Sequence, residues 1–461
     1  MVSIQLLIFI VFLIGALKFG GSAYHPAVVM LGSWIFMLLF QSVRLIHYEY
    51  EVLSLELLML QTFFVGMFLL GSVFQIRSGE SPSGLAADAR SASGVDMVVL
   101  MLIMALLIHA SIVGFEIFEV GFSVLDIRQM RLAHWEETEY SHGAMSFTKA
   151  VARPMVVILV IMAPSFRGGL PRIAALIGFL VVGFAESLLA GGRIFLAFCI
   201  LGWSISYFLH RDVQSPQWYI DAAGRLRSSS TFVSKVILSV LGVVLLYLCF
   251  GVFPIIRETD IVGNEDLHLS WVAGASQVSP LARTVSTTTG IESIAVFAYG
   301  SGYITSPMMR SNYLLKETDI KDWLFLGGNN FPVFSKIRAL AVGGQTSEQL
   351  VKEKIAAAQT FGKNPWIGGV MDIVIDFGIY GGGFFMFLYG GICGWVFRSM
   401  RDLQHPEFLA AASVLSITLI AFPFCSFIRL SVTTFTLMVC FLAVGFRTLF
   451  GTIRVHLWDG A

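Results

Sequence analysis

The sequence carries little charge for its length. Asp, Glu, Lys and Arg make up only 13% of the 461 residues, whereas hydrophobic residues make up 56%; a soluble domain typically has about 25% charged residues. Lys and Arg total 30, as do Asp and Glu, so the chain lacks the basic surplus of a nucleic-acid-binding protein. This composition indicates a membrane protein and no nucleic-acid partner.

Motifs for metals, nucleotides and disulfides are also lacking. The five cysteines lie in apolar stretches and no CxxC pair occurs, so neither a disulfide framework nor a zinc site is indicated. The sequence contains no Walker A motif, no dinucleotide fingerprint and no HExxH motif. We therefore expect no metal and no cofactor, and any substrate has to be already activated and membrane-borne.

Apolar runs fill most of the chain. A helix that crosses a bilayer needs about 20 apolar residues, and the candidate spans are 3–21, 26–45, 53–75, 96–120, 147–166, 171–190, 193–210, 233–255, 371–398, 407–428 and 430–451. The predicted fold class is an all-α polytopic membrane protein with about 11 (roughly 10–13) transmembrane helices.

One long stretch of mixed polarity, residues 257–365, interrupts these runs. It separates N-terminal membrane helices in 1–256 from C-terminal membrane helices in 366–461. Lys and Arg gather in the connections 211–232 and 399–406, as in cytoplasmic loops. The long loop is then expected to face outward, where loops of this length are usually functional.

Arg193 is the strongest candidate for a functional residue. It follows Gly191 and Gly192 at the start of a span and, by this topology, lies at the outer interface. There a guanidinium can hold a phosphate bidentately, or it can simply anchor the end of the span. Glu186 lies within the preceding span and needs a partner there, for which Arg193 and Arg153 are the candidates.

Charged residues of two other spans leave similar choices open. His109, Glu116 and Glu119 in the span 96–120 could form the proton relay of a transporter. The simpler interpretation places Glu119 at the interface and Glu116 against a neighbouring helix. Lys149 and Arg153 begin the next span at the outer face. They could surround an anionic headgroup, or only mark the interface.

The long loop and the helix that follows it add polar candidates. Tyr303 and Asn312 are types that contact sugars, and Arg310 can bind a phosphate or a carboxylate, although all three can also serve solvation. Asp372 and Asp376 lie four residues apart, on one face of a helix. Either could act as a general base for a hydroxyl group, cap a helix or pair with an arginine.

Glycine patterns predict the local structure around these residues. Gly378 with Gly382 and Gly390 with Gly394 form small-xxx-small pairs, which predict close helix packing. Gly, Asn and aromatic residues dominate 323–335, which predicts an ordered but irregular loop.

Six segments of the sequence carry a family resemblance: HPAVVMLGSWIFMLLF (25–40), VLSLELLMLQTFFVGMFLLGSVF (52–74), GGRIFLAFCILGW (191–203), GYITSPMMRSNYL, GGNNFPVFSKI and WIGGVMDIVIDFGIYGG. Together they resemble the Wzy-type O-antigen or oligosaccharide repeat-unit polymerases. The similarity covers most of the chain in layout. It departs from the family where Gly-Gly replaces Ser or Gly-Ser before Arg193, and the loop lacks the His-Asn pair of the related O-antigen ligases.

The resemblance implies a GT-C-like glycosyltransferase bundle in the bacterial inner membrane, with the large loop in the periplasm. Donor and acceptor would be glycans linked to undecaprenyl diphosphate, and a chain-length-regulator membrane protein is a candidate partner. The catalytic candidates are Arg193 and Asp376. The substrate-binding candidates are Arg193, Arg310, Arg153, Tyr303, Asn312 and Glu186.

Three other functions compete with a polymerase. An O-antigen ligase would use the same donor with a different acceptor. A transporter or flippase of lipid-linked oligosaccharides should show internal repeats and broken helices near the membrane midplane, and no clear repeat relates the halves of this sequence. A membrane scaffold without chemistry would leave Arg193, Glu186 and the polar loop residues unexplained.

Overall fold

A computed structural model of the chain describes a defined part of the sequence. The described residues are 2–20, 22, 24–43, 46–47, 53–77, 95–120, 144–166, 169–186, 194–214, 218–220, 226–228, 277–278, 280, 284, 288, 305–316, 318, 320, 324–331, 353, 367–403, 405–426, 428, 430–450 and 454–455. All structural statements below concern these residues.

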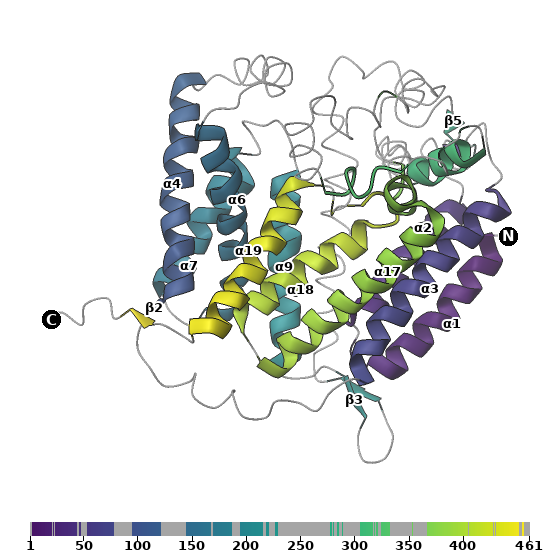
Figure 1. Cartoon of the computed structure of the whole chain (residues 1–461), viewed down its shortest axis with the longest axis horizontal. Coiled ribbons are helices and arrows are strands. Elements are labelled where there is room, and N and C mark those ends of the chain that lie inside the picture. The colour runs from purple at the N-terminus through teal and green to yellow at the C-terminus, as the bar shows by residue number, and fades with distance from the viewer. Residues whose placement is uncertain are drawn as a thin grey trace. The chain divides into compact units, whose positions relative to one another are not determined.

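Helices dominate this part of the chain (Figure 1). They are α1 (Val2–Gly20), α2 (Pro26–Val43), α3 (Leu55–Arg77), α4 (Met97–Val120), α6 (Ala144–Met162), η2 (Ala163–Ser165), α7 (Gly169–Gly178), η3 (Phe179–Ala185), α9 (Ile194–Gln214), α17 (Gly369–Leu403), α18 (Pro406–Ala421) and α19 (Ser431–Phe450). Residues 305–316 are also helical. Strands of two or three residues form three antiparallel pairs: β1 (Ile46–His47) with β5 (Gln277–Val278), β2 (Val95–Asp96) with β6 (Arg454–Val455), and β3 (Trp218–Ile220) with β4 (Leu226–Ser228).

The predicted apolar runs coincide with these helices, except for 233–255, which lies outside the described residues. Three helical stretches, Leu55–Val73, Met97–Phe118 and Gly369–Arg401, are long and apolar enough to cross a membrane, and further apolar helices of the described chain are shorter. The structure is therefore that of an α-helical protein with apolar helices, as expected of a helical membrane protein. The number of spans and the side of the membrane that each loop faces remain predictions.

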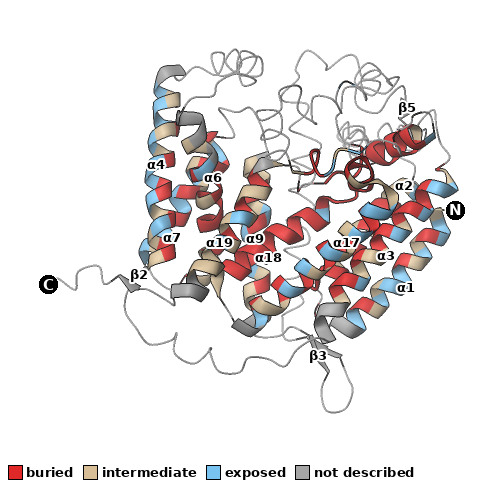
Figure 2. Cartoon of the chain, in the orientation of Figure 1, coloured by how far each residue is buried: buried red, intermediate tan, exposed pale blue. Residues whose placement is uncertain are grey.

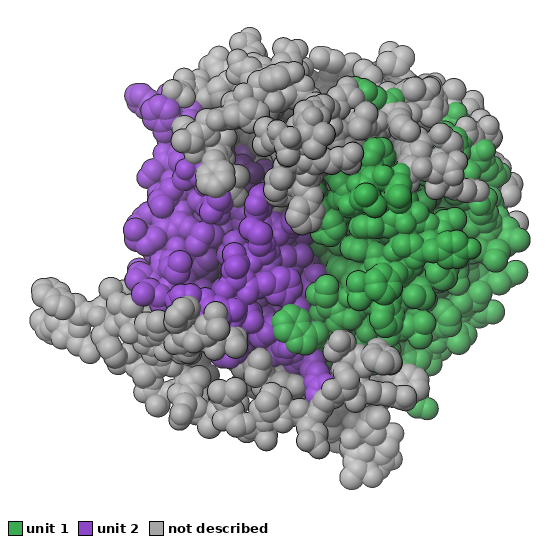
Figure 3. All heavy atoms as spheres, viewed as in Figure 1, with its two compact units in different colours: residues 1–78, 216–395, 418–430 green, residues 79–215, 396–417, 431–461 purple. Residues whose placement is uncertain are grey.

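The helices belong to two compact units, which interleave along the sequence (Figure 3). Unit 1 comprises residues 1–78, 216–395 and 418–430 and includes α1, α2, α3 and most of α17. Unit 2 comprises residues 79–215, 396–417 and 431–461 and includes α4, α6, α7, η3, α9 and α19. The linear division at residues 256 and 365 remains a prediction.

Helix α1 exposes apolar residues on its outer side and buries one polar side chain, Gln5, beside Phe9 and Ala16. Residues of α1 range from exposed to buried in Figure 2, and Ile4 and Leu7 are 64% and 62% exposed. Gln5 is buried and donates hydrogen bonds to the Gln61 side chain at 3.2 Å and to the Leu58 carbonyl at 3.3 Å. Exposed apolar residues and a buried amide nitrogen that is hydrogen-bonded suit a helix that faces lipid.

Glycines allow α3 and α17 to approach very closely within unit 1. A Cβ atom on Gly71 would lie 1.9 Å from the Phe387 carbonyl oxygen, and one on Gly390 would lie 2.1 Å from the Phe68 carbonyl oxygen. A Cβ on Gly394 would lie 2.7 Å from the Ser72 carbonyl oxygen. The predicted packing of the Gly390 and Gly394 pair is therefore confirmed.

The prediction that Gly378 also serves helix packing is wrong. A Cβ atom on Gly378 would meet nothing within 4 Å. Its φ of 66° and ψ of −174° instead break α17 into two helical segments, a backbone conformation that glycine adopts without the steric cost of a side chain. Its partner Gly382 does pack closely, because a Cβ there would lie 2.6 Å from the Phe64 ring.

Substituting Gly390 by alanine tests the close approach of α3 and α17. The added methyl collides with backbone, which cannot move aside as a side chain does, so Gly390→Ala should destabilise the protein by about 1–3 kcal/mol. Gly66→Ala is the matched control, since a Cβ atom there meets nothing within 4 Å. Alanine also has a higher helix propensity than glycine. Unfolding by SDS titration in detergent micelles measures both. Equal unfolding midpoints for the two variants would show that the helices do not touch at Gly390.

Candidate functional site

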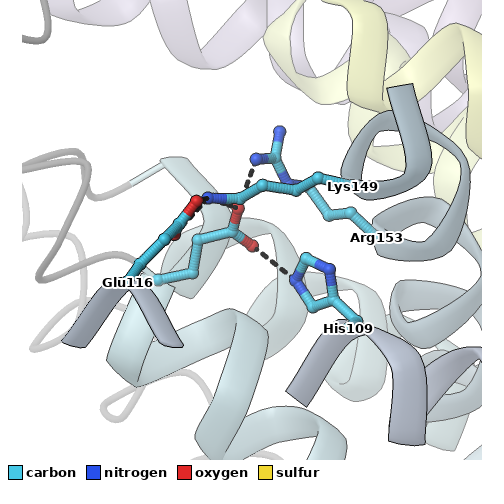
Figure 4. Close-up of polar contacts among 5 residues, drawn as sticks. His109, Glu116, Lys149 and Arg153 are labelled. Carbon is cyan, nitrogen blue, oxygen red and sulfur yellow. Dashed lines mark hydrogen bonds and ion pairs between the residues drawn. The ribbon is translucent and has the colours of Figure 1, made fainter. Parts of the chain in front are cut away.

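A cluster of charged side chains lies inside unit 2, where three helical elements meet (Figure 4). His109 and Glu116 come from α4, and Lys149 and Arg153 come from the first half of α6. Glu186 directly follows η3. Residues 109 and 116 are two turns apart and 149 and 153 are one turn apart, so each pair lies on one face of its helix.

Glu186 is the centre of this cluster. Its Oε2 atom lies 3.1 Å from His109 Nε2. Its Oε1 atom forms ion pairs with Arg153 Nη2 and, at 3.6 Å, with Lys149 Nζ. Lys149 Nζ also donates to both carboxylate oxygens of Glu116, at 2.8 and 2.6 Å. The carboxylate of Glu186 therefore holds a histidine and two cations in place.

Burial differs strongly across the cluster. The side chains of His109 and Glu186 are 0% and 1% exposed, whereas Arg153 retains 22%, Glu116 24% and Lys149 15% exposure. The cluster thus runs from a buried end to an accessible end. A charge taken out of water is costly unless it is paired, and each charged side chain of the cluster has an opposite charge within ion-pair distance.

The local backbone explains how Glu186 reaches its partners. Helix α7 continues directly into η3, which is a π-helix, and the Glu186 N–H bonds to the Val181 carbonyl five residues earlier. An additional residue in a turn rotates the following side chains by about 100° relative to a continuous α-helix. The side of the helix on which Glu186 lies is therefore set by the π-helix, a form often found at functional sites.

An aromatic ring also positions Arg153. The guanidinium carbon lies 4.5 Å from the centre of the Phe195 ring at the start of α9. Such a cation–π contact fixes the plane of the guanidinium without using its N–H donors. The Arg153 Nε atom has no hydrogen-bond partner among the described residues, so one donor of the guanidinium is not engaged.

A second polar group lies in unit 1, at the break in α17. Asp372 and Asp376 are fully buried in the helical segment that precedes Gly378. The break leaves the carbonyls of residues 375 and 376 without their usual helical partners, and backbone N–H groups of Phe325 and Leu326 take these places at 3.1 and 2.8 Å. The loop 324–331 therefore caps the end of a helical segment.

The same loop binds the Asp376 carboxylate. Asp376 Oδ1 accepts the Asn329 backbone N–H at 2.9 Å, and Oδ2 accepts the Asn330 backbone N–H at 2.6 Å and its side-chain amide at 2.7 Å. Gly327 has a φ of 86°, which turns the loop so that successive N–H groups converge on one anion. Among the described residues, no Lys or Arg forms an ion pair with Asp376.

Asp372 connects this loop to another part of unit 1. Its Oδ1 accepts the Asn329 side-chain amide at 3.2 Å, and its Oδ2 accepts the Ser426 backbone N–H at 2.8 Å. The sequence prediction that Asp372 and Asp376 share one helix face is confirmed, because both carboxylates contact the Asn329–Asn330 turn.

The structure distributes the predicted site residues over both units. Arg153 and Glu186 contact each other in unit 2, so the prediction of Arg153 as a partner of Glu186 is confirmed. Arg310 and Asn312 lie in the buried helix 305–316 of unit 1, where Asn312 Oδ1 accepts the Ser54 N–H at 2.8 Å. Arg193 and Tyr303 lie outside the described residues.

Two features of the sites could not be inferred from the sequence, whereas the helix contact of Glu116 could. The pairing of His109 with Glu186 joins residues 77 positions apart, and nothing in the local pattern indicates it. The contact of Glu116 with a neighbouring helix was the simpler of two interpretations and is confirmed by its bonds to Lys149. The Gly-Gly-Asn-Asn stretch predicted an ordered loop, but not its binding to Asp376.

No protein-family model matches the chain, and neither does any curated protein or solved structure. Among the described residues, no group of three or more His, Cys, Asp or Glu side chains could hold a metal ion. The chemistry of the two polar groups themselves therefore has to carry the functional argument.

Proposed function

We propose that the protein polymerises oligosaccharide repeat units linked to undecaprenyl diphosphate, at the periplasmic face of the bacterial inner membrane. The observation that carries this proposal is the partly exposed pair of cations, Lys149 and Arg153, held on one buried carboxylate among apolar helices. Ionisable groups are costly in such surroundings and usually mark a pathway or a binding site. A diphosphate that is attached to an isoprenoid tail suits both the cations and the apolar helices.

The reaction requires positive charge at the donor. A hydroxyl group of the acceptor attacks the anomeric carbon of the donor glycan, a new C–O bond forms, and the C–O bond to the diphosphate breaks. The diphosphate leaves with the electron pair, and negative charge builds on its oxygens. Guanidinium and ammonium groups stabilise this charge. Arg153 has N–H donors beyond the one on Glu186, and Phe195 holds the plane of its guanidinium.

The hydroxyl proton passes to a base, for which Asp376 is the candidate from the sequence. Both oxygens of its carboxylate already accept N–H groups from the loop 324–331. A role as base therefore requires this loop to leave the carboxylate when substrates bind. In the proposal, Arg193 adds a further cation at the donor, and Arg310, Asn312 and Tyr303 contact the glycans.

Loss of either donor-binding arginine, Arg153 or Arg193, should stop chain extension. In a strain that depends on the plasmid-borne protein, Arg153→Met and Arg193→Ala are each expected to reduce polymerisation by about 100-fold, the usual effect of removing one donor to a developing charge. Gel analysis of the surface polysaccharide measures the chain length, and immunoblotting of membranes measures the amount of protein. The exposed Arg401 at the end of α17 provides a matched control, Arg401→Met.

The proposal would be refuted by full-length polymer in a strain that carries only Arg153→Met. The deletion strain distinguishes between the functions. A single repeat unit on lipid A indicates loss of a polymerase, whereas no repeat unit indicates loss of a ligase or of an exporter of lipid-linked oligosaccharides.

The break in α17 favours a second candidate, a transporter or flippase of lipid-linked oligosaccharides. Discontinuous helices with buried carboxylates form the substrate and ion sites of many secondary transporters. Helix α17 is broken at Gly378, and the buried Asp372 and Asp376 precede the break by six and two residues. A deletion strain that accumulates lipid-linked single repeat units on the cytoplasmic side of the membrane would favour this function over the polymerase.

A further inference from the structure

The charges of the unit 2 cluster cancel. Lys149 and Arg153 contribute two positive charges, and Glu116 and Glu186 contribute two negative charges, while His109 adds a charge only when it is protonated. A site without net positive charge attracts an anion only weakly. A diphosphate can therefore bind strongly to the two cations only if one of the two carboxylates moves away.

Glu186 is unsuited to leave. Its side chain is 1% exposed, and its two oxygens contact His109, Lys149 and Arg153 together. Departure of this carboxylate would break three interactions and leave the buried end of the cluster without a negative charge. Such a loss is strongly unfavourable in an apolar surrounding.

Glu116 has the opposite properties. Its side chain is 24% exposed and, among the described residues, Lys149 is its only polar partner. It lies in the last turns of α4, which ends at Val120. Rotation of this one side chain would open the exposed side of the Lys149 ammonium group without breaking any contact of Glu186.

The contact between Glu116 and Lys149 has the geometry that a bound anion would have on this lysine. Both carboxylate oxygens of Glu116 lie within hydrogen-bond distance of the Lys149 Nζ atom, at 2.8 and 2.6 Å. Two oxygens of a phosphate group can make the same contact. Arg153 is held by the same Glu186 oxygen as Lys149, and its Nε has no hydrogen-bond partner among the described residues. That Nε atom is itself buried, so an anion on Lys149 would contact Arg153 through the part of its side chain that keeps 22% exposure.

We propose that Glu116 is an exchangeable counter-ion that occupies the place of a diphosphate on Lys149 and leaves when the diphosphate binds. This inference rests on the proposed function and adds to it a mechanism of selectivity. An anion with a single charge, such as chloride, gains too little binding energy at Lys149 to displace a carboxylate. A diphosphate carries more charge and can reach both cations, so it compensates for the lost contact.

Binding of inorganic pyrophosphate to the purified full-length protein in detergent micelles tests this exchange. Isothermal titration calorimetry is expected to give about tenfold tighter binding for Glu116→Gln than for the wild type, which corresponds to about 1.4 kcal/mol. Adding Lys149→Met should abolish this gain. Glu56→Gln removes the same charge from an exposed position on α3 and should leave the affinity at the wild-type value.

Two results would overturn the exchange without removing the anion site. One is pyrophosphate binding by Glu116→Gln that is equal to or weaker than wild-type binding. The other is an equal gain in Glu56→Gln, which would reveal an effect of net charge alone. If, in either case, the single variant Lys149→Met binds pyrophosphate more weakly than the wild type, the anion site of the proposed function stands without the exchange. Wild-type affinity in both Lys149→Met and Arg153→Met would remove the anion site and the exchange together.

Farnesyl diphosphate as a second probe separates the lipid headgroup from the free anion. A gain for both probes in Glu116→Gln supports exchange against a lipid diphosphate. A gain for pyrophosphate alone supports the exchange, but contradicts a lipid-linked donor and therefore the proposed function.

Discussion

Glu186→Leu is expected to destabilise the protein by about 3 kcal/mol, because it leaves Arg153 and Lys149 without the carboxylate that they share. Breaking a buried ion pair by removing one partner typically costs about 3–5 kcal/mol. The lower value applies here, because both cations keep some exposure and Lys149 keeps Glu116. SDS titration in detergent micelles measures the change in the free energy of unfolding.

A double-mutant cycle separates the ion pair from the change in packing. Arg153→Met and Glu186→Leu should together cost about 1–3 kcal/mol less than the sum of the single substitutions, as is usual for residues in direct contact. Phe198→Leu in α9 is a control for repacking, since Phe198 is buried and uncharged. Strict additivity of Arg153→Met and Glu186→Leu would mean that the ion pair does not hold unit 2 together.

Asp376→Asn should have a similarly large effect, although the two side chains have nearly the same shape. Three N–H groups of Asn329 and Asn330 converge on the two carboxylate oxygens. An amide presents one NH2 group to these donors, so at least one buried N–H loses its acceptor. Hydrogen bonds to a charged group contribute about 1.5–3 kcal/mol each, and we expect a total loss of about 3 kcal/mol.

Hydrogen exchange shows where this loss occurs. The backbone amides of Asn329 and Asn330 should exchange about 100-fold faster in Asp376→Asn if the loop leaves the carboxylate, since each factor of ten corresponds to about 1.4 kcal/mol. Asn330→Ala is the matched control, because it removes the side-chain bonds and keeps both backbone N–H groups on Asp376.

The Asp376→Asn variant also distinguishes the structural and the catalytic roles of Asp376. A general base can be replaced with little change in stability, so unchanged amide exchange with a large fall in polymerisation rate would identify a base. Fast exchange with a loss of stability would identify a residue that holds the loop 324–331. Unchanged exchange together with an unchanged rate would contradict both roles.

Sequence patterns located the helices well, because apolar runs long enough to form helices are strong signals. They also indicated the close packing at Gly390 and Gly394, which follows from spacing along one helix. The pattern could not show that Gly378 breaks α17, because its spacing to Gly382 is also that of a packing pair. The difference lies in the backbone angles, which depend on the loop 324–331 that caps the break.

The charged cluster was predictable only in part. A carboxylate inside an apolar run needs a partner, and this requirement identified Glu186 and the candidate Arg153. The choice of His109 and Lys149 depends on how α4 and α6 pack against η3, which is a long-range property. The π-helix adds a rotation that a period of 3.6 residues does not contain.

The position of Glu186 in the chain also bears on biosynthesis. Domains fold largely in the order in which the ribosome delivers them, and α4 and α6 emerge before Glu186. Glu116 and Lys149 can therefore pair first, whereas the carboxylate partner of Arg153 is not yet synthesised at that stage. When the helix that ends at Glu186 arrives, both of its cationic partners are already present. A truncated chain that stops before this helix would expose an unmatched arginine, a feature that quality-control proteases could detect.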